Sequence, residues 1–369
     1  MGQFEQEVFS MGDMPKRRIR LGEYPYTFVR VIVMRTALFK QHDYDKLLKM
    51  SLPEISRFMQ DSSYREEITS LGSRFHGVDL IERSITLSLE KTFSKLRAIS
   101  SPELRILIDL YLGRYDYSNC KTILRAIFSV IPKEIIKESL FFVGALGQHD
   151  FEDMLNSTSV AEAIDTIPFL EKKERKLLAS SFDRSKNLIS VENFLDRRYY
   201  AGVLHVLPLL SRAGALFREF LMEEIYILDF LTAVKLKSLG IPSLDIEKYF
   251  IAGKPASLRG KQFGEKIKRV LNASSLTPEE LFKILKNSPF GDVTKNASSS
   301  VISLGQAEIN LYSILLKKTL ILQHQHPLSV DVILGFMFAK EIEGRNIRTI
   351  AKGKHLGLTE EQLAQLIVR

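Results

Sequence analysis

Four residue types recur three times along this chain in a fixed order, at steps of about a hundred positions. Each copy starts with a glutamate on an apolar stripe, followed 34 to 37 positions later by an acid, three positions further by a small polar residue, and then by a cation. The three sets are Glu82, Asp116, Asn119 and Arg125; Glu192, Asp229, Thr232 and Lys237; and Glu308, Glu343, Asn346 and Lys352. This repetition predicts three related units, an organisation typical of scaffolds.

A second repeated pattern marks the starts of short helices. A capping or turn residue is followed by an early acid and an apolar face, and a Ser/Thr/Asn turn closes the helix. The pattern occurs at 52–55, 151–155 and 277–281, and a fourth copy begins at 359–363. Since a long amphipathic stretch is left over near the start, we expect the two ends to complete one unit and close the three into a cup or funnel.

Apolar residues recur with helical spacing in nearly every part of the chain. The i, i+3, i+4 pattern is clear in 28–38, 106–111, 123–127, 225–231 and 333–337, and no run alternates as a strand would. We therefore predict an all-α fold of three similar helical domains arranged as a pseudo-threefold funnel. The predicted parts are an N-terminal extension at 1–23 and repeat units at 24–149, 150–275 and 276–369, with an insertion at 253–275 and a polar loop at 292–300.

Composition bounds the class of protein. Hydrophobic residues at 45% and charged residues at 26% are ordinary for a globular chain, and the net charge of +8 is spread without a long block. The one cysteine, Cys120, excludes a disulfide framework and fits a reducing compartment. No apolar run approaches the roughly 18 residues that span a bilayer, and no signal peptide is evident. We expect a cytoplasmic protein that meets a membrane only through a partner.

Motifs for nucleotide, metal or nucleophile chemistry are weak in this sequence. Gly260-Lys261 and Gly353-Lys354 lack the following hydroxyl and the earlier glycine of a phosphate loop, so we predict a basic loop and a helix C-cap. His324 and His326 are two ligands at most, and Cys120 lies on an apolar helical face. We therefore predict no catalytic, cofactor-binding or metal residues.

The repeated acidic and polar positions have a structural and a catalytic interpretation. A catalytic site would use one copy, whereas three copies in register fit buried groups that hold helices in place, because an unpaired buried group costs about 1–3 kcal/mol. Two other classes stay open at this point. One is a helical-repeat adaptor that binds an acidic protein or nucleic acid; the other is an all-α hydrolase using one repeat's pair of acids, such as Asp116.

An ordered set of stretches resembles a known family. They are Tyr24-Pro25-Tyr26 through Arg30 and Met34, then 116–125, 193–200, and 339–350 running on through Gly353-Lys354 and Gly357-Leu358. From Tyr24 onward the chain resembles the C subunit of the archaeal and bacterial V/A-type ATP synthases, the counterpart of the d subunit of the eukaryotic vacuolar ATPase. It departs from that pattern at 1–23, at Thr232, where the family favours Asn, and at 251–254, a poor version of a Gly-rich turn.

The resemblance implies a non-catalytic central-stalk subunit without a cofactor. Its expected role is a socket on the membrane ring of c (or K) subunits, at the cytoplasmic face of the cell membrane, that receives the D and F subunits of the central stalk. Torque for ATP synthesis or ion pumping would pass through it. The resemblance implies no nucleic-acid partner, and membrane association through the ring only.

Overall fold

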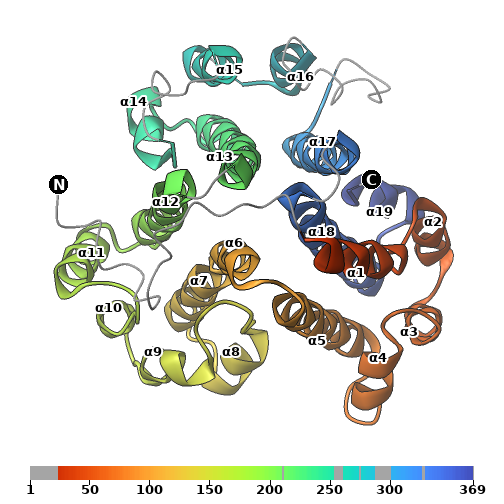
Figure 1. Ribbon diagram of the computed structural model, residues 1–369. Coiled ribbons are helices and arrows are strands. Elements are labelled where there is room, and N and C mark those ends of the chain that lie inside the picture. Colours follow the sequence, from red (N-terminus) through yellow and green to blue (C-terminus); the bar gives the residue numbers. More distant parts are fainter. Residues whose placement is uncertain are drawn as a thin grey trace. The chain divides into compact units, whose positions relative to one another are not determined.

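The computed structural model in Figure 1 is built of helices. The structure describes residues 24–209, 212–252, 261–273, 276–286, 301–325 and 329–368. These residues contain no strand, which confirms the all-α prediction. The predicted extension at 1–23, the loop at 292–300, Gly260 and His326 lie outside the described residues.

The helices form two compact units. Of the residues that the structure describes, those from Ser101 to Arg218 form the first unit, and those of 24–100 and from Glu219 onward form the second. The second unit therefore combines the two outer parts of the chain. The repeat boundaries at 149/150 and 275/276 do not coincide with this division and stay a prediction.

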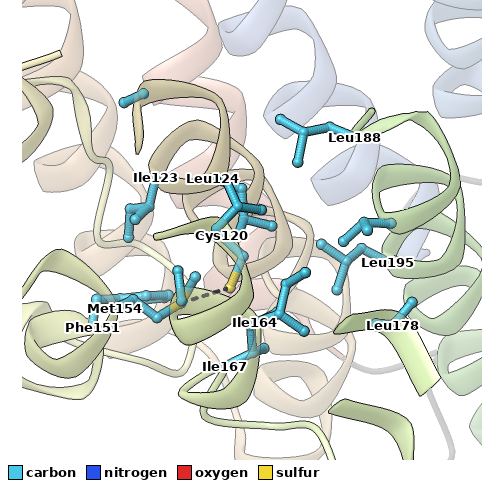
Figure 2. Packing of buried hydrophobic residues seen from close by; sticks show 14 of the residues in the cluster. Cys120, Ile123, Leu124, Phe151, Met154, Ile164, Ile167, Leu178, Leu188 and Leu195 are labelled. Atoms are coloured by element: carbon cyan, nitrogen blue, oxygen red, sulfur yellow. Dashed lines mark hydrogen bonds between the residues drawn. The ribbon is translucent and has the colours of Figure 1, made fainter. Parts of the chain in front are cut away.

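In the first unit, helices α7 to α12 surround one apolar core. Within it, α7 packs against α9, α10 and α12, and α11 packs against α10 and α12. Figure 2 shows the buried side chains of this core around Cys120. The helices are α6 (Pro102–Leu112), α7 (Arg114–Phe128), α8 (Lys133–Ser139), η1 (Gln148–Phe151), α9 (Glu152–Asn156), α10 (Val160–Asp165), α11 (Lys172–Ser185), α12 (Ile189–Val206) and η2 (Leu207–Leu209).

In the second unit, the long helix α18 is the central element. It packs against α1, α3, α5, α17 and α19, and its long buried face explains why its sequence is apolar on several sides. The early helices are α1 (Pro25–Thr36), α2 (Gln41–Lys49), α3 (Leu52–Gln60), α4 (Arg65–Leu71) and α5 (Gly77–Ala98). The later ones are α13 (Arg212–Ser238, which begins in the first unit), α14 (Ser243–Ile246), η3 (Glu247–Tyr249), α15 (Lys261–Asn272), α16 (Pro278–Lys286), α17 (Leu304–Gln325), α18 (Val330–His355) and α19 (Glu360–Leu366).

Three of the long helices, α7, α13 and α18, end in the same way. Just beyond each helix one residue has a left-handed φ, and the next amide donates to the carbonyl five residues earlier, which is the Schellman arrangement. The left-handed residues are Val130 (φ 55°), Gly240 (φ 75°) and Gly357 (φ 76°). A short helix (α8, α14 or α19) begins directly afterwards.

These helix ends correct two details of the sequence prediction. Gly353 is not the C-cap glycine, because it lies inside the last turn of α18, where a Cβ would come within 2.2 Å of Leu363 Cδ2. The segment at 359–363 does not start another copy of the capped helix at 52–55; it forms α19, which has the place after α18 that α8 has after α7. The predicted capping does occur, since Thr359 Oγ1 accepts from the amide of Gln362 at 3.3 Å.

Candidate functional site

The repeated acids act as clamps on the backbone. Asp116 is buried on α7, and its carboxylate accepts hydrogen bonds from the amides of Ala145 at 2.8 Å and Leu146 at 3.4 Å. A Cβ on Gly144 would lie 2.0 Å from Asp116 Oδ1, so this close approach requires glycine. The clamp therefore anchors the chain that follows α8 onto α7.

The polar residue three positions after the acid completes the clamp. Asn119 donates from Nδ2 to the carbonyl of Phe141 at 2.9 Å and accepts from the amide of Phe141 at 3.0 Å. In α18, Asn346 makes the same pair of bonds to Val368, at 2.7 and 2.8 Å. Both partners lie 22 residues beyond the asparagine, so α7 and α18 hold the chain that follows them with the same hydrogen bonds.

In α13 the acid is the same but the polar residue differs. Asp229 is buried and accepts from the amides of Ile251 at 2.7 Å and Ala252 at 3.1 Å. Thr232 stands where the other copies have asparagine, and residue 254, which is 22 positions beyond it, lies outside the described residues.

Glu343 takes its backbone donor from the opposite end of the chain. Its Oε2 accepts from the amide of Phe39 at 2.5 Å, and its Oε1 accepts from the Tyr64 hydroxyl at 2.6 Å and from Lys340 Nζ at 2.7 Å. Glu343 is 2% exposed and Lys340 is 4% exposed, so this ion pair is fully buried. Burial first, and then the charge of Glu343, raise the pKa of Tyr64, which keeps the phenol protonated and able to donate.

These contacts join residues from the two ends of the sequence. The unmatched helical stretch near the start and the incomplete pattern at 359–363 predict such contacts. Lys354 Nζ donates to the carbonyl of Leu48 at 2.6 Å, and α19 packs against α2. The sequence patterns did not identify Phe39 or Tyr64 as partners of Glu343, because no local spacing signals a contact across 304 or 279 positions. Lys340 was also missed, although its i,i+3 spacing from Glu343 on one helix is a signal that could have found it.

The repeated glutamates form ion pairs between helices of successive predicted repeats. Each glutamate lies on the first long helix of one repeat and pairs with a cation on the second long helix of the repeat before it, and the first repeat pairs with the third. The pairs are Glu192 with Arg125 (2.6 Å), Glu308 with Lys235 (3.2 Å) and Glu82 with Lys352 (2.6 Å). The cations are about half exposed or more, so each pair adds at most roughly 1 kcal/mol.

We call each of these three ion-paired helix contacts a seam. Two of the seams have a second contact, one helical turn away from the ion pair. Beside the pair of Arg125 and Glu192, Lys121 pairs with Asp196 at 2.6 Å. Beside the pair of Lys352 and Glu82, Arg348 donates to Thr86 Oγ1 at 2.9 Å. The contacts therefore fix the register of α7 on α12 and of α18 on α5, each within one compact unit.

Lys237, the cation of the second repeated set, differs from Arg125 and Lys352 in its partner. Lys237 does not pair with Glu308; it donates to the carbonyl of Leu271 at 2.9 Å, and Lys235 and Arg345 take the glutamate instead. The interpretation of the acid and asparagine positions as buried, hydrogen-bonded groups fits Asp116, Asn119 and Asn346, whose bonds hold the chain that follows each helix. The glutamate–cation pairs differ from that expectation, because they are partly exposed and connect neighbouring repeats.

The other candidate groups have structural roles where they are described. Cys120 is buried, its Sγ lies 3.8 Å from Met154 Sδ (Figure 2), and burial raises the pKa of its thiol, which disfavours the reactive thiolate. Among the described residues, no group of three His, Cys, Asp or Glu side chains could hold a metal ion. No helix in the described parts of the chain is long and apolar enough to cross a membrane.

Fold and site together define a class of protein: an all-helical scaffold with buried polar groups and ion pairs between its long helices. A family model described as the ATP synthase (C/AC39) subunit matches residues 28–366. The chain is 32% identical to the C subunit of the A-type ATP synthase of Haloquadratum walsbyi over 346 residues, covering 92% of this chain and 96% of that protein. It is 31% identical to the protein of the same name from Methanosarcina barkeri, with 96% and 95% covered.

The chain belongs to the ATP synthase C/AC39 subunit family. Members of this family are non-catalytic subunits of a rotary complex. This confirms the resemblance given by the sequence and the prediction that the chain is not an enzyme. It sets aside both the hydrolase and the unrelated adaptor.

Proposed function

We propose that this chain is a central-stalk rotor subunit of an A-type ATP synthase, seated between the membrane ring of c (or K) subunits and the D and F subunits of the stalk. In this position it transmits torque for ATP synthesis or ion pumping. It lies on the cytoplasmic face of the cell membrane and meets the membrane only through the ring. Family membership and the relatives' shared name support the rotary complex as its setting.

The order in which the ion pairs connect the predicted repeats supports a role as a socket. A linear stack of repeats leaves its first and last faces unpaired. Here Glu82 of the first predicted repeat pairs with Lys352 of the third, as Glu192 pairs with Arg125. This order favours a closed set of three repeats, the pseudo-threefold funnel, and a closed, close-packed set resists deformation under torque.

A bridging experiment tests the position of the protein in the complex. The c (or K) ring, tagged and solubilised in detergent, is immobilised, and the D–F pair is added with and without this chain. We expect the ring to retain D–F only when the chain is present. Equal retention without the chain, or none with it at low-micromolar concentration, contradicts the proposal.

A coupling experiment tests the transmission of torque. Complexes assembled without this chain, reconstituted into vesicles, should hydrolyse ATP in the catalytic head and pump no ions. Adding the purified chain should restore ATP-driven pumping. Pumping without the chain at the rate of the complete complex would show that torque takes another route.

A further inference from the structure

Helix α1 is apolar on two opposite faces. The inner face carries Thr27 and Val31, which are buried, as is Tyr24 just before the helix. Helix α1 packs against α18, and Thr27 Oγ1 donates to the carbonyl of Ile99 at 2.7 Å. The outer face carries Tyr26, Val29 and Val33, which are 62%, 57% and 63% exposed. A helix that is apolar all round is normally buried all round. The described part of the chain therefore leaves the outer face of α1 incompletely covered.

The spacing of the outer side chains indicates what covers them. Tyr26, Val29 and Val33 stand at i, i+3 and i+7, the spacing with which one helix packs along another. Ile32, 37% exposed, borders this stripe. β-Branched side chains are stiff and lose little freedom on packing, which suits such a helix contact.

The positive charge of α1 indicates which charge its partner carries beside the apolar contact. Pro25–Thr36 contains two arginines and no acidic residue. Arg30 lies beside the stripe, one turn from both Tyr26 and Val33, and is exposed. No carboxylate among the residues that the structure describes forms an ion pair with it. A partner helix with carboxylates beside its own apolar stripe complements both features.

We propose that the outer face of α1 is a docking site for an amphipathic α-helix with acidic flanks, contributed by the central-stalk pair D–F. This proposal rests on the proposed function and adds the place and the chemistry of the contact. Three or four side chains are fewer than the 20–30 residues that each side of a stable interface usually contributes, so the stripe is one anchor within a larger contact.

Affinity measurements with paired variants of the full chain test this site. Val29→Ser combined with Val33→Ser should weaken binding of D–F by about tenfold or more, because the anchor is lost. Leu177→Ser, at a helix position that is 60% exposed, is the matched control and should bind as the wild type does. All variants should keep the wild-type unfolding midpoint.

The charge component has its own pair of variants. Arg30→Glu should weaken D–F binding and reduce its dependence on salt, since a favourable charge contact is reversed. Arg184→Glu, an exposed reversal on α11, should change neither.

Cysteine protection provides a readout that does not depend on affinity. The natural Cys120 is buried, so a maleimide should react selectively with an introduced exposed thiol. Saturating D–F should slow the labelling of Val33→Cys and leave that of Leu177→Cys unchanged.

The possible outcomes separate the two proposals. Failure of the wild-type chain to bind D–F contradicts the proposed function itself. Wild-type binding with unchanged affinity of the Val29→Ser/Val33→Ser variant, or with no protection of Val33→Cys, overturns only the α1 site. Protection of Val33→Cys by anionic vesicles or by a second copy of the chain, but not by D–F, also overturns it and names a different occupant.

Discussion

Glu343 accepts a hydrogen bond at 2.5 Å from the amide of Phe39, which precedes it by 304 positions in the chain. In the first repeat, the corresponding acid, Asp116, takes its amide donors from residues 29 and 30 positions after it. The same clamp is thus closed locally in one repeat and by the opposite end of the chain in another.

Replacing Glu343 by glutamine should strongly destabilise the protein. The buried Lys340 ammonium would lose its counter-charge, and breaking a buried ion pair costs about 3–5 kcal/mol. Urea unfolding measures the effect, with Glu219→Gln, an exposed site on α13, as the control expected within about 0.5 kcal/mol of wild type. Equal midpoints for the two variants would show that the buried charge pair is not needed for stability.

Adding a methyl group at Gly144 should open the first clamp. The new Cβ would overlap Asp116, so Gly144→Ala should lower the free energy of unfolding by about 2–4 kcal/mol through crowding and lost hydrogen bonds. Gly305→Ala on α17, where the new Cβ meets nothing within 4 Å beyond the neighbouring residues and the helix backbone, should be neutral or stabilise by up to about 1 kcal/mol. Thermal melting of both variants checks the contrast, and a loss at Gly305 as large as at Gly144 would contradict it.

Val130→Gly should stabilise the isolated chain. Val130 is β-branched, has φ 55° and is 88% exposed, so glycine removes backbone strain of about 1–2 kcal/mol and little packing. The greater freedom of glycine in the unfolded chain offsets part of this gain. Gly240→Val, at the equivalent helix end with φ 75° and open space around it, should destabilise through strain alone. A lower melting temperature for Val130→Gly would mean that the valine makes stabilising contacts in the isolated chain.

The ion pair of Arg125 and Glu192 should contribute little to the stability of the protein, and this contribution should fall as salt is added. Glu192→Gln is expected to lower stability by at most about 1 kcal/mol in dilute buffer, because the Arg125 side chain is 62% exposed. The difference should shrink in molar salt, where screening is strong. A loss of several kcal/mol that persists in salt would contradict a partly exposed, screened pair.

Glu162 should make stability depend on acid pH. The amide of Thr158 donates to its carboxylate at 2.7 Å, which lowers the pKa of Glu162 below its ordinary value of 4.5. A lowered pKa in the folded state means that its contribution is present above the unfolded pKa and is lost as pH falls through the folded one. The difference in melting temperature between wild type and Glu162→Gln should therefore shrink as pH falls from about 6 towards 3. A difference that stays constant over that range would show that the carboxylate charge is not the cause.

Much of the fold is predictable from the sequence, because helical periodicity and capping are local. The positions of Asp116, Asn119 and Asn346 could be recognised from the repeat alone. The choice of Lys235 over Lys237 as the partner of Glu308 could not, since it depends on how α13 turns towards α17. The division into two units was also missed, because it depends on which helices pack together and not on where the repeats begin.

The composition of the second unit has a consequence for biosynthesis. Residues 101–218 are contiguous, so they can finish packing while the rest is still being translated. Helices α1 to α5 leave the ribosome before them, yet the partners of Phe39, Leu48 and Glu82 lie at positions 343 to 354. Helices α1, α3 and α5 therefore complete their packing only after α18 has been made, and the faces that they pack against it stay uncovered until then.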